Sequence, residues 1–371
     1  MPVEPAADEA AWAAAGLLDG LQEGGREERC ALLRWLAAQG CSLEEMVAAH
    51  AVGRLFALAG DRVIRPPGSR RSVAEAAAEL DATEHAVRRA WRALGLPDPG
   101  ATGLDDDDLA AVRTALDVVR LMGESTGLAL VRVLGAGAAR LADAESSAMR
   151  GVDGIDVGRT HSELRTAQVW QAVAGFVPRV GHALDVAHRR HIDLARRHWE
   201  DVLHADGTVR SGVGFADLTG FTALSQRAPL PELAALLAAF DEKASDVVHA
   251  GGGRVVKFLG DAVMWVASSP DGMVAIAHEL VHAPAARDAG LRLRAAVAAG
   301  EVVAQEGDWY GPPVNLAARL VGVAQPGQVL AAADPALRLS PAWVAVPLEP
   351  VALRGVEGPV TAYDVRAAQR S

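Results

Sequence analysis

Residues 214–222 read GFADLTGFT, residues 257–264 read KFLGDAVM, and residues 307–319 read GDWYGPPVNLAAR. One such segment alone would be a weak signal. Three of them, in this order and at these separations, form a specific pattern. The residues that flank the three segments predict the fold in which they lie.

The sequence around these segments alternates between short β-forming runs and helical stretches. A strand is expected at Val213–Leu218, and a helix at Pro231–His249, which begins with a proline and is followed by glycines. Gly260 and Asp261 join two β runs in a hairpin. The other expected elements are strands at Arg254–Leu259, Ala262–Ala267 and Leu291–Ala298, helices at Asp271–Ala289 and Val314–Gly322, and β runs between Gln328 and Val365. The β-α-β-β-α-β order predicts an α+β, ferredoxin-like domain.

The bulk composition is that of a globular protein with two domains. The chain has 371 residues, half of them apolar, and a mean hydropathy of +0.14. Its formal net charge of −11 argues against a nucleic-acid partner, which needs clustered cations to displace counterions. Cys30 and Cys41 are the only cysteines, so two free thiols are expected and no zinc spacing exists.

No targeting signal is visible in the sequence. The first residues, MPVEP, are acidic and lack the basic region of a secretory signal. No uncharged apolar run approaches the length of about 18 residues that a membrane-spanning helix needs. We therefore expect no membrane span and a soluble, cytoplasmic protein.

The first part of the chain predicts helices throughout. Residues 1–205 are expected to form an all-helical regulatory domain ahead of the α+β domain at residues 206–371. Helical periodicity runs through residues 8–60, where Ser42 and Glu45 have the spacing of a capping box.

A long helical stretch joins the two expected domains. It runs from Ser162 to Leu203, with an interruption expected at Pro178, and ends in a turn-like joint at residues 204–207. Because one helix can pass a movement along its length, we interpret residues 162–205 as a linker or switch helix.

Residues 72–122 allow a second interpretation, because their three expected helices resemble a helix-turn-helix of the MerR-like kind. A DNA-binding protein would place the second helix, with Arg88, Arg89 and Arg92, in a major groove. The segment carries five arginines against ten carboxylates, or eleven when Glu124 is included. This charge favours a helical regulatory module over a DNA-binding one.

The three segments quoted first resemble those of the catalytic domain of the class III adenylyl cyclases, over about residues 211–366. The resemblance implies an enzyme that converts ATP to 3′,5′-cyclic AMP and pyrophosphate. Two divalent ions, Mg²⁺ or Mn²⁺, can lower the pKa of the ribose 3′-hydroxyl and neutralise the leaving phosphates. Asp217, at the end of the first strand, and Asp261, at the hairpin tip, match the metal ligands of the family.

Four successive backbone N–H groups are expected to hold the β- and γ-phosphate oxygens, because they lead from the first strand into a helix. They belong to Leu218, Thr219, Gly220 and Phe221.

By the same resemblance, Lys257 and Asp308 specify adenine, since the lysine donates to N1 and the aspartate accepts from the N6 amino group. Guanine presents the reverse pattern and would want a carboxylate in place of Lys257. A guanylyl cyclase is therefore one alternative. A DNA-binding regulator with a non-catalytic nucleotide-sensing domain is another.

Asn315 and Arg319 complete the residues carried over from the family. They lie four apart and so share one helix face. The resemblance implies that Asn315 orients the ribose and that Arg319 stabilises charge on the phosphates in the transition state. In the family, the two metal-binding aspartates act in one protomer, and the other four residues come from its partner. We therefore expect a head-to-tail homodimer with twofold symmetry and two sites.

The first half also resembles, more loosely, the regulatory domain of acid-activated, autoinhibited class III cyclases. The resemblance rests on the helical architecture and on the helix-ending stretch GLPDP at residues 95–99. In the expected linker helix, His191 and His198 continue an apolar stripe that includes Leu184. They are either ordinary solvated histidines or a pH switch, because charging a histidine in a packed seam near pH 6.5 penalises the inhibited arrangement.

Overall fold

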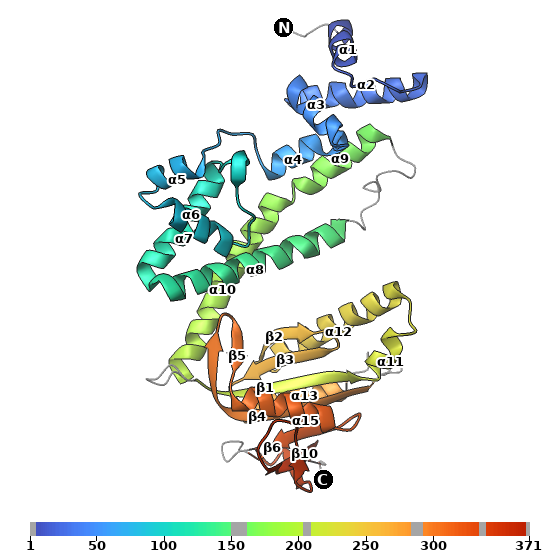
Figure 1. Cartoon of the computed structure of the whole chain (residues 1–371). Coiled ribbons are helices and arrows are strands. Elements are labelled where there is room, and N and C mark those ends of the chain that lie inside the picture. Colours follow the sequence, from blue (N-terminus) through green and yellow to red (C-terminus); the bar gives the residue numbers. More distant parts are fainter. Residues whose placement is uncertain (1–4, 150–161, 203–208, 283–291, 334–338, 369–371) are drawn as a thin grey trace. The chain divides into compact units, whose positions relative to one another are not determined.

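The computed structural model describes residues 5–149, 162–202, 209–282, 292–333 and 339–368. The chain divides into two compact units, residues 1–190 and residues 191–371. This division falls within the helix Val177–Val202. The expected domain boundary, between residues 205 and 206, lies outside the described residues and stays a prediction. The first unit is built of helices, and the second contains the sheet (Figure 1). Each unit has its own buried apolar cores.

The first unit consists of helices that form two separate apolar cores. One core joins the four N-terminal helices to α9, where Arg29 donates two hydrogen bonds of 2.6 Å to the Glu163 carboxylate. The second core lies among α5, α6, α7 and α8. The α-helices are α1 (Pro5–Ala14), α2 (Glu23–Ala38), α3 (Leu43–Ala51), α4 (Leu58–Ile64), α5 (Val73–Glu79), α6 (Glu84–Ala93), α7 (Asp106–Met122), α8 (Glu124–Met149) and α9 (Glu163–Ala174), with short 3₁₀ helices at Leu55–Ala57 and Gly100–Thr102.

Several of these helices begin and end where local sequence signals predict. Ser42 accepts a hydrogen bond from the Glu45 N–H, which closes the expected capping box of α3. Thr83 and Asp105 likewise cap α6 and α7. Gly95, directly after the cap of α6, has a φ of +78°, a conformation that glycine adopts without strain.

The long stretch from Ser162 forms two helices, α9 and α10 (Val177–Val202). The break lies at Gly175 and Phe176, and Pro178 lies in the first turn of α10. Proline fits that position because its missing N–H has no helical partner there. Pro178 therefore marks the start of the second helix and does not interrupt a continuous one.

The second unit is built on a sheet with the strand order β2-β3-β1-β4-β6-β10-β7, with β5 paired to β4. The first four strands of this order pair antiparallel, which is the ferredoxin-like arrangement that the sequence predicts. The strands are β1 (Val209–Thr219), β2 (Arg254–Leu259), β3 (Ala262–Ala267), β4 (Arg292–Gln305), β5 (Asp308–Tyr310), β6 (Val329–Ala332), β7 (Trp343–Pro347) and β10 (Ala362–Ala367), with a separate pair β8 (Val351–Ala352) and β9 (Pro359–Val360).

Helices cover both faces of this sheet. Ala216 and Leu218 of β1 pack in one core with α12 and α13, whereas Val213 and Phe215 pack in the other with α15. The alternation is that of a strand buried on both sides. The helices are α11 (Phe221–Ser225), α12 (Leu230–Ala250), α13 (Pro270–His282) and α15 (Pro312–Val323).

Gly214, in the first quoted segment, allows a close approach between strands. It pairs with Trp265 of β3, and a Cβ at Gly214 would come within 2.2 Å of the indole ring. Only glycine leaves room for this fully buried tryptophan on the surface of β1.

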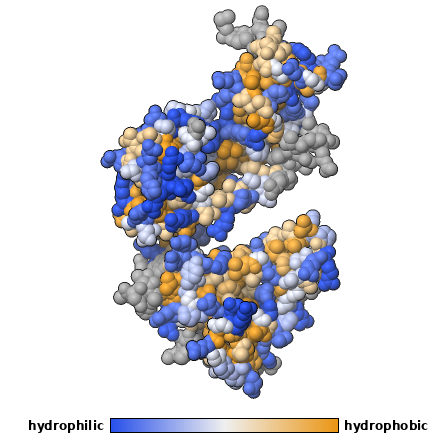
Figure 2. All heavy atoms as spheres, in the orientation of Figure 1, coloured by the Kyte–Doolittle hydropathy of each residue, from blue (hydrophilic) through white to orange (hydrophobic). Residues whose placement is uncertain are grey.

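Figure 2 shows polar residues over the visible surface of both units, with apolar residues scattered among them. Within the described part of the chain, none of the helices combines the length and the apolar composition needed to cross a bilayer.

Candidate active site

The two aspartates expected to bind metal lie side by side at one end of the sheet. β1 and β3 pair so that Asp217 stands opposite Ala262, and the Leu218 N–H donates to the Asp261 carbonyl over 3.1 Å. Burial raises the pKa of Asp261, and the charge of the neighbouring Asp217 raises it further. Two adjacent, partly buried carboxyl groups are therefore present, and a cation would relieve their repulsion.

Arg294 supplies part of the positive charge at this point. It stands opposite Asp217 in the β1–β4 pairing, and its Nη2 and Nε donate to Asp217 Oδ2 over 2.6 and 3.0 Å. Its Nη1 donates to the Gly322 carbonyl, near the end of α15, over 2.9 Å. Arg294 was not predicted from the sequence, although an arginine directly before the apolar run AAVAA at residues 295–299 was a signal.

The donor set fits a hard divalent cation. Carboxylate oxygens are the ligands that Mg²⁺ and Mn²⁺ prefer. Among the described residues, no group of three histidine, cysteine, aspartate or glutamate side chains could hold a metal ion. A site with two aspartates is nevertheless usual for Mg²⁺, which keeps waters and takes substrate phosphates as its remaining ligands.

Lys257 and Asp308 come together although they are distant in the sequence. Lys257 of β2 forms an ion pair with Asp308 of β5, and Asp308 also accepts a hydrogen bond of 2.8 Å from the Trp309 N–H. A register shift in the β2–β3 pairing lies directly before Lys257. Such a bulge re-aims the side chains that follow it.

Asn315 and Arg319 lie on the exposed face of α15, as their spacing predicts, while Pro313, Ala317 and Leu320 are buried. Within the described part of this single chain, neither is hydrogen-bonded or ion-paired to Asp217 or Asp261. The candidate residues therefore form three separate groups. They are the two aspartates with Arg294, the Lys257–Asp308 pair, and the exposed face of α15 that carries Asn315 and Arg319, called here the α15 face.

The expected phosphate loop has the predicted position but one fewer donor. Gly220 has a φ of +85° and joins β1 to α11. The Leu218 N–H already donates to Asp261 in the strand pairing, so it does not serve as a phosphate donor. Thr219, Gly220 and Phe221 remain as candidates.

Comparisons with known proteins agree with these features. Residues 10–192 match the family model described as adenylate cyclase regulatory domain, and residues 205–367 match that of the adenylate and guanylate cyclase catalytic domain. An adenylate cyclase of Glutamicibacter nicotianae is 31% identical over 323 residues, which cover 80% of this chain and 78% of that relative. The chain belongs to the class III adenylate cyclase family.

Two further relatives span the cyclase almost completely. An uncharacterized protein of Mycobacterium tuberculosis is 46% identical over 93% of this chain and 92% of its own length. A protein of the same species named pH-sensitive adenylate cyclase is 29% identical over 94% of this chain and 91% of its own length.

The histidine stripe of the cyclase lies on an exposed part of α10, as far as the described residues show. His191 lies on the exposed part of α10, where Leu184 is 48% and Leu194 is 60% exposed. The seam is not packed within the described part of this chain, because the apolar residues around it are open to solvent. His198 belongs to α10, but its side chain lies outside the described residues.

The arginines of α6 are occupied by neighbouring carboxylates. Arg88 donates to Asp98 over 2.6 and 2.7 Å, and Arg89 forms an ion pair with Glu124. The Nε of Arg92 donates to the Arg88 carbonyl. DNA binding depends on cationic side chains that replace the counterions of the phosphates. Arginines already paired with carboxylates do this poorly, so these contacts add to the charge argument against DNA binding by the cyclase.

Proposed function

We propose that this cyclase converts ATP to 3′,5′-cyclic AMP and pyrophosphate in sites shared between two copies of the chain, with two divalent ions at each site. The observation that carries the choice of ATP is the Lys257–Asp308 pair. An ammonium group can donate to adenine N1, and a carboxylate can accept from the adenine N6 amino group.

Before substrate binds, these two residues satisfy each other, so neither charge is left unpaired in a partly buried place. On binding, adenine would replace this mutual contact with one hydrogen bond to each residue. Guanine offers a donor at N1 and an acceptor at O6, which would set like groups against each other at both positions. The pair therefore favours ATP over GTP.

At the reacting end of the substrate, Asp217 and Asp261 would hold the divalent ions, and Arg294 would keep the Asp217 carboxylate oriented through its two hydrogen bonds. Bound there, such ions lower the pKa of the 3′-hydroxyl and neutralise the phosphates. The 3′-oxygen bonds to the α-phosphorus while the bond from that phosphorus to pyrophosphate breaks, and the hydroxyl proton leaves to solvent. Arg319 would stabilise the charge that develops on the phosphates, and Asn315 would orient the ribose.

The homodimer is supported by the separation of these groups in one chain. Arg319 has no ion pair to Asp217 or Asp261 among the described residues, and its face of α15 is exposed. A twofold dimer would bring the α15 face and the Lys257–Asp308 pair of one copy to the aspartates of the other, and would do so twice.

We also propose that residues 1–205 regulate the catalytic residues, with acid pH as the stimulus. The name of the pH-sensitive relative and the two histidines of α10 support this. Since the seam around His191 is exposed in one chain, the histidines would act where α10 meets another surface.

The direct test of the reaction is product formation by the purified chain. Incubated with Mn²⁺, it should form cyclic AMP from ATP and little cyclic GMP from GTP. Preference for GTP would favour the guanylyl alternative. No cyclic product from either nucleotide, at neutral or acid pH, would favour a nucleotide sensor.

A further inference from the structure

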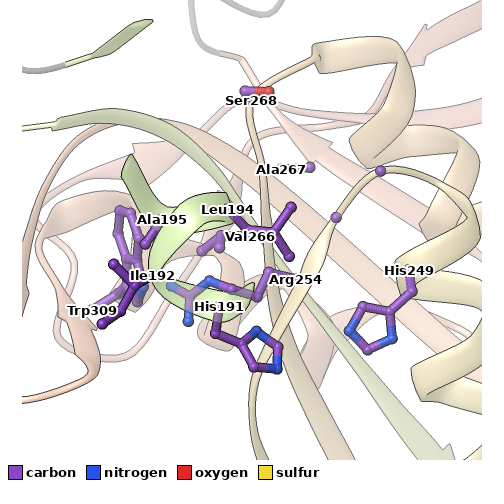
Figure 3. Close-up of a pocket in the computed structure, with 12 residues that line it drawn as sticks. His191, Ile192, Leu194, Ala195, His249, Arg254, Val266, Ala267, Ser268 and Trp309 are labelled. Carbon is purple, nitrogen blue, oxygen red and sulfur yellow. The ribbon is translucent and has the colours of Figure 1, made fainter. Parts of the chain in front are cut away.

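A cavity of about 480 Å³ lies in the second unit, beside the strands that carry Lys257 and Asp308. Figure 3 shows its walls: residues 191–195 of α10, the turn from α12 into β2, the end of β3, and Trp309 of β5. Its size is that of pockets that hold small molecules. None of the residues that we assign to the reaction lines it.

The titratable side chains among the described residues that line this cavity are all basic. They are His191, His249 and Arg254, and none of the described residues in its lining is a carboxylate. In a chain with a net charge of −11, a cavity lined in this way favours an anion over a cation. The side chains come from α10, the end of α12 and the start of β2, so the cationic character is not a property of one helix.

Arg254 is the permanent charge among them. Its guanidinium lies over the indole ring of Trp309, 5.7 Å from the ring centroid, and Trp309 is 3% exposed. Desolvation lowers the pKa of Arg254, and none of the described carboxylates forms an ion pair with it. A guanidinium that faces the cavity without a carboxylate partner among the described residues gains from an anion that enters it.

The remaining walls include apolar side chains. Leu194 on α10 and Val266 on β3 line the cavity, and Leu194 is 60% exposed. A ligand with a compact apolar body would remove part of this surface from water. We propose that this cavity binds a small organic anion, with its acidic group on Arg254, His191 and His249 and its apolar body between Leu194 and Val266.

The position of the cavity gives such a ligand access to the base-recognition strands. Arg254 precedes Lys257 by three residues in β2, and Trp309 follows Asp308 directly in β5. An anion bound here would tie residues 191–195 of α10 to both strands. This consequence rests on the proposed function, whereas the binding itself does not.

The test uses the full chain and two probes of the same shape, benzenesulfonate and the neutral benzenesulfonamide, at fixed ionic strength. Calorimetry should detect the sulfonate and little or no sulfonamide. In nuclear magnetic resonance spectra, the imidazole signals of His191 and His249, assigned by single His→Gln variants, should shift with the sulfonate.

Arg254→Gln should weaken sulfonate binding at least about tenfold, as expected for the loss of a charge-assisted hydrogen bond. Arg354→Gln, a change at an exposed arginine elsewhere in the same unit, should leave it unchanged. Thermal unfolding of both variants checks that they fold; if Arg254→Gln does not, Arg254→Lys should bind the sulfonate with intermediate affinity.

Asp217→Ala should bind the sulfonate as wild type does, so the proposal can be tested in a chain that makes no product. Equal binding of the two probes, no sulfonate binding by the wild-type chain, or equal weakening by Arg254→Gln and Arg354→Gln would each overturn it.

Discussion

Asp217 lies between two neighbours of opposite charge. Arg294 holds one carboxylate oxygen at 2.6 Å, and the pKa of Asp261, raised by burial, is raised further by Asp217 and lowered by Arg294. The arginine therefore offsets part of the repulsion between the two carboxylates and fixes the orientation of one of them. A residue in this position acts through the metal ligand that it holds.

Replacing Arg294 with methionine should weaken metal binding, so that more Mn²⁺ is needed for half-maximal activity. Loss of such an outer partner typically costs about 10- to 100-fold in metal affinity or activity. The measurement is the Mn²⁺ concentration for half-maximal activity at saturating ATP. Arg366→Met is the matched control, because Arg366 holds one oxygen of Asp364 by the same two nitrogens. Identical metal curves for Arg294→Met and wild type would contradict the positioning role.

The base-recognition pair gives a second prediction at single residues. Lys257→Glu combined with Asp308→Cys should reduce ATP cyclisation strongly, since unpaired groups at such a site cost about 1–3 kcal/mol each. The measurement is kcat/KM for ATP and for GTP, with thermal unfolding to show that the variant folds. An unchanged value for ATP would mean that these two residues do not read the base.

At the scale of helices and strands, close packing between helices depends on particular glycines. Gly135 of α8 lies against the end of α6, where an added Cβ would come within 2.5 Å of the Leu94 backbone. Gly137, two residues later in the same helix, has nothing within 4 Å of the place where a Cβ would lie. The two positions have the same helical backbone and differ in their surroundings.

Alanine at these two glycines should have opposite effects on the free energy of unfolding. Gly135→Ala should destabilise by about 1–3 kcal/mol through overpacking. Gly137→Ala should stabilise by up to about 1 kcal/mol through helix propensity. Denaturant unfolding of the full chain, followed by helical circular dichroism, compares them. Effects of the same sign would show that the contact between α6 and α8 is not as close as described.

Elements whose ends depend on nearby residues could be predicted from the sequence. The cap at Ser42 and the hairpin at Gly260 are local, and the structure has them where expected. Features that join distant segments could not be predicted, because strand register decides them. Arg294 reaches Asp217 only through the pairing of β1 with β4, and the same kind of pairing occupies the Leu218 N–H.

For the whole molecule, the regulatory proposal predicts higher activity of the full chain at mildly acidic pH. A histidine gains charge as the pH falls through about 6.5, so an inhibited arrangement that holds neutral histidines is favoured above that pH and penalised below it. His191→Ala with His198→Ala should flatten the profile of cyclic AMP formation, and residues 206–371 alone should lose much of the response. A full pH response in the isolated catalytic residues would rule out regulation by the first half.

The central claim is that two chains share each active site, and mixing two inactive variants tests it most directly. Asp217→Ala and Arg319→Ala should each be nearly inactive, since each lesion disables both sites of its own homodimer. Mixed in equal amounts and allowed to exchange, they should recover about a quarter of wild-type activity, because about half of the dimers are then heterodimers in which one of the two sites carries neither lesion. No recovery, in a mixture where heterodimers are shown to form, would contradict the shared site.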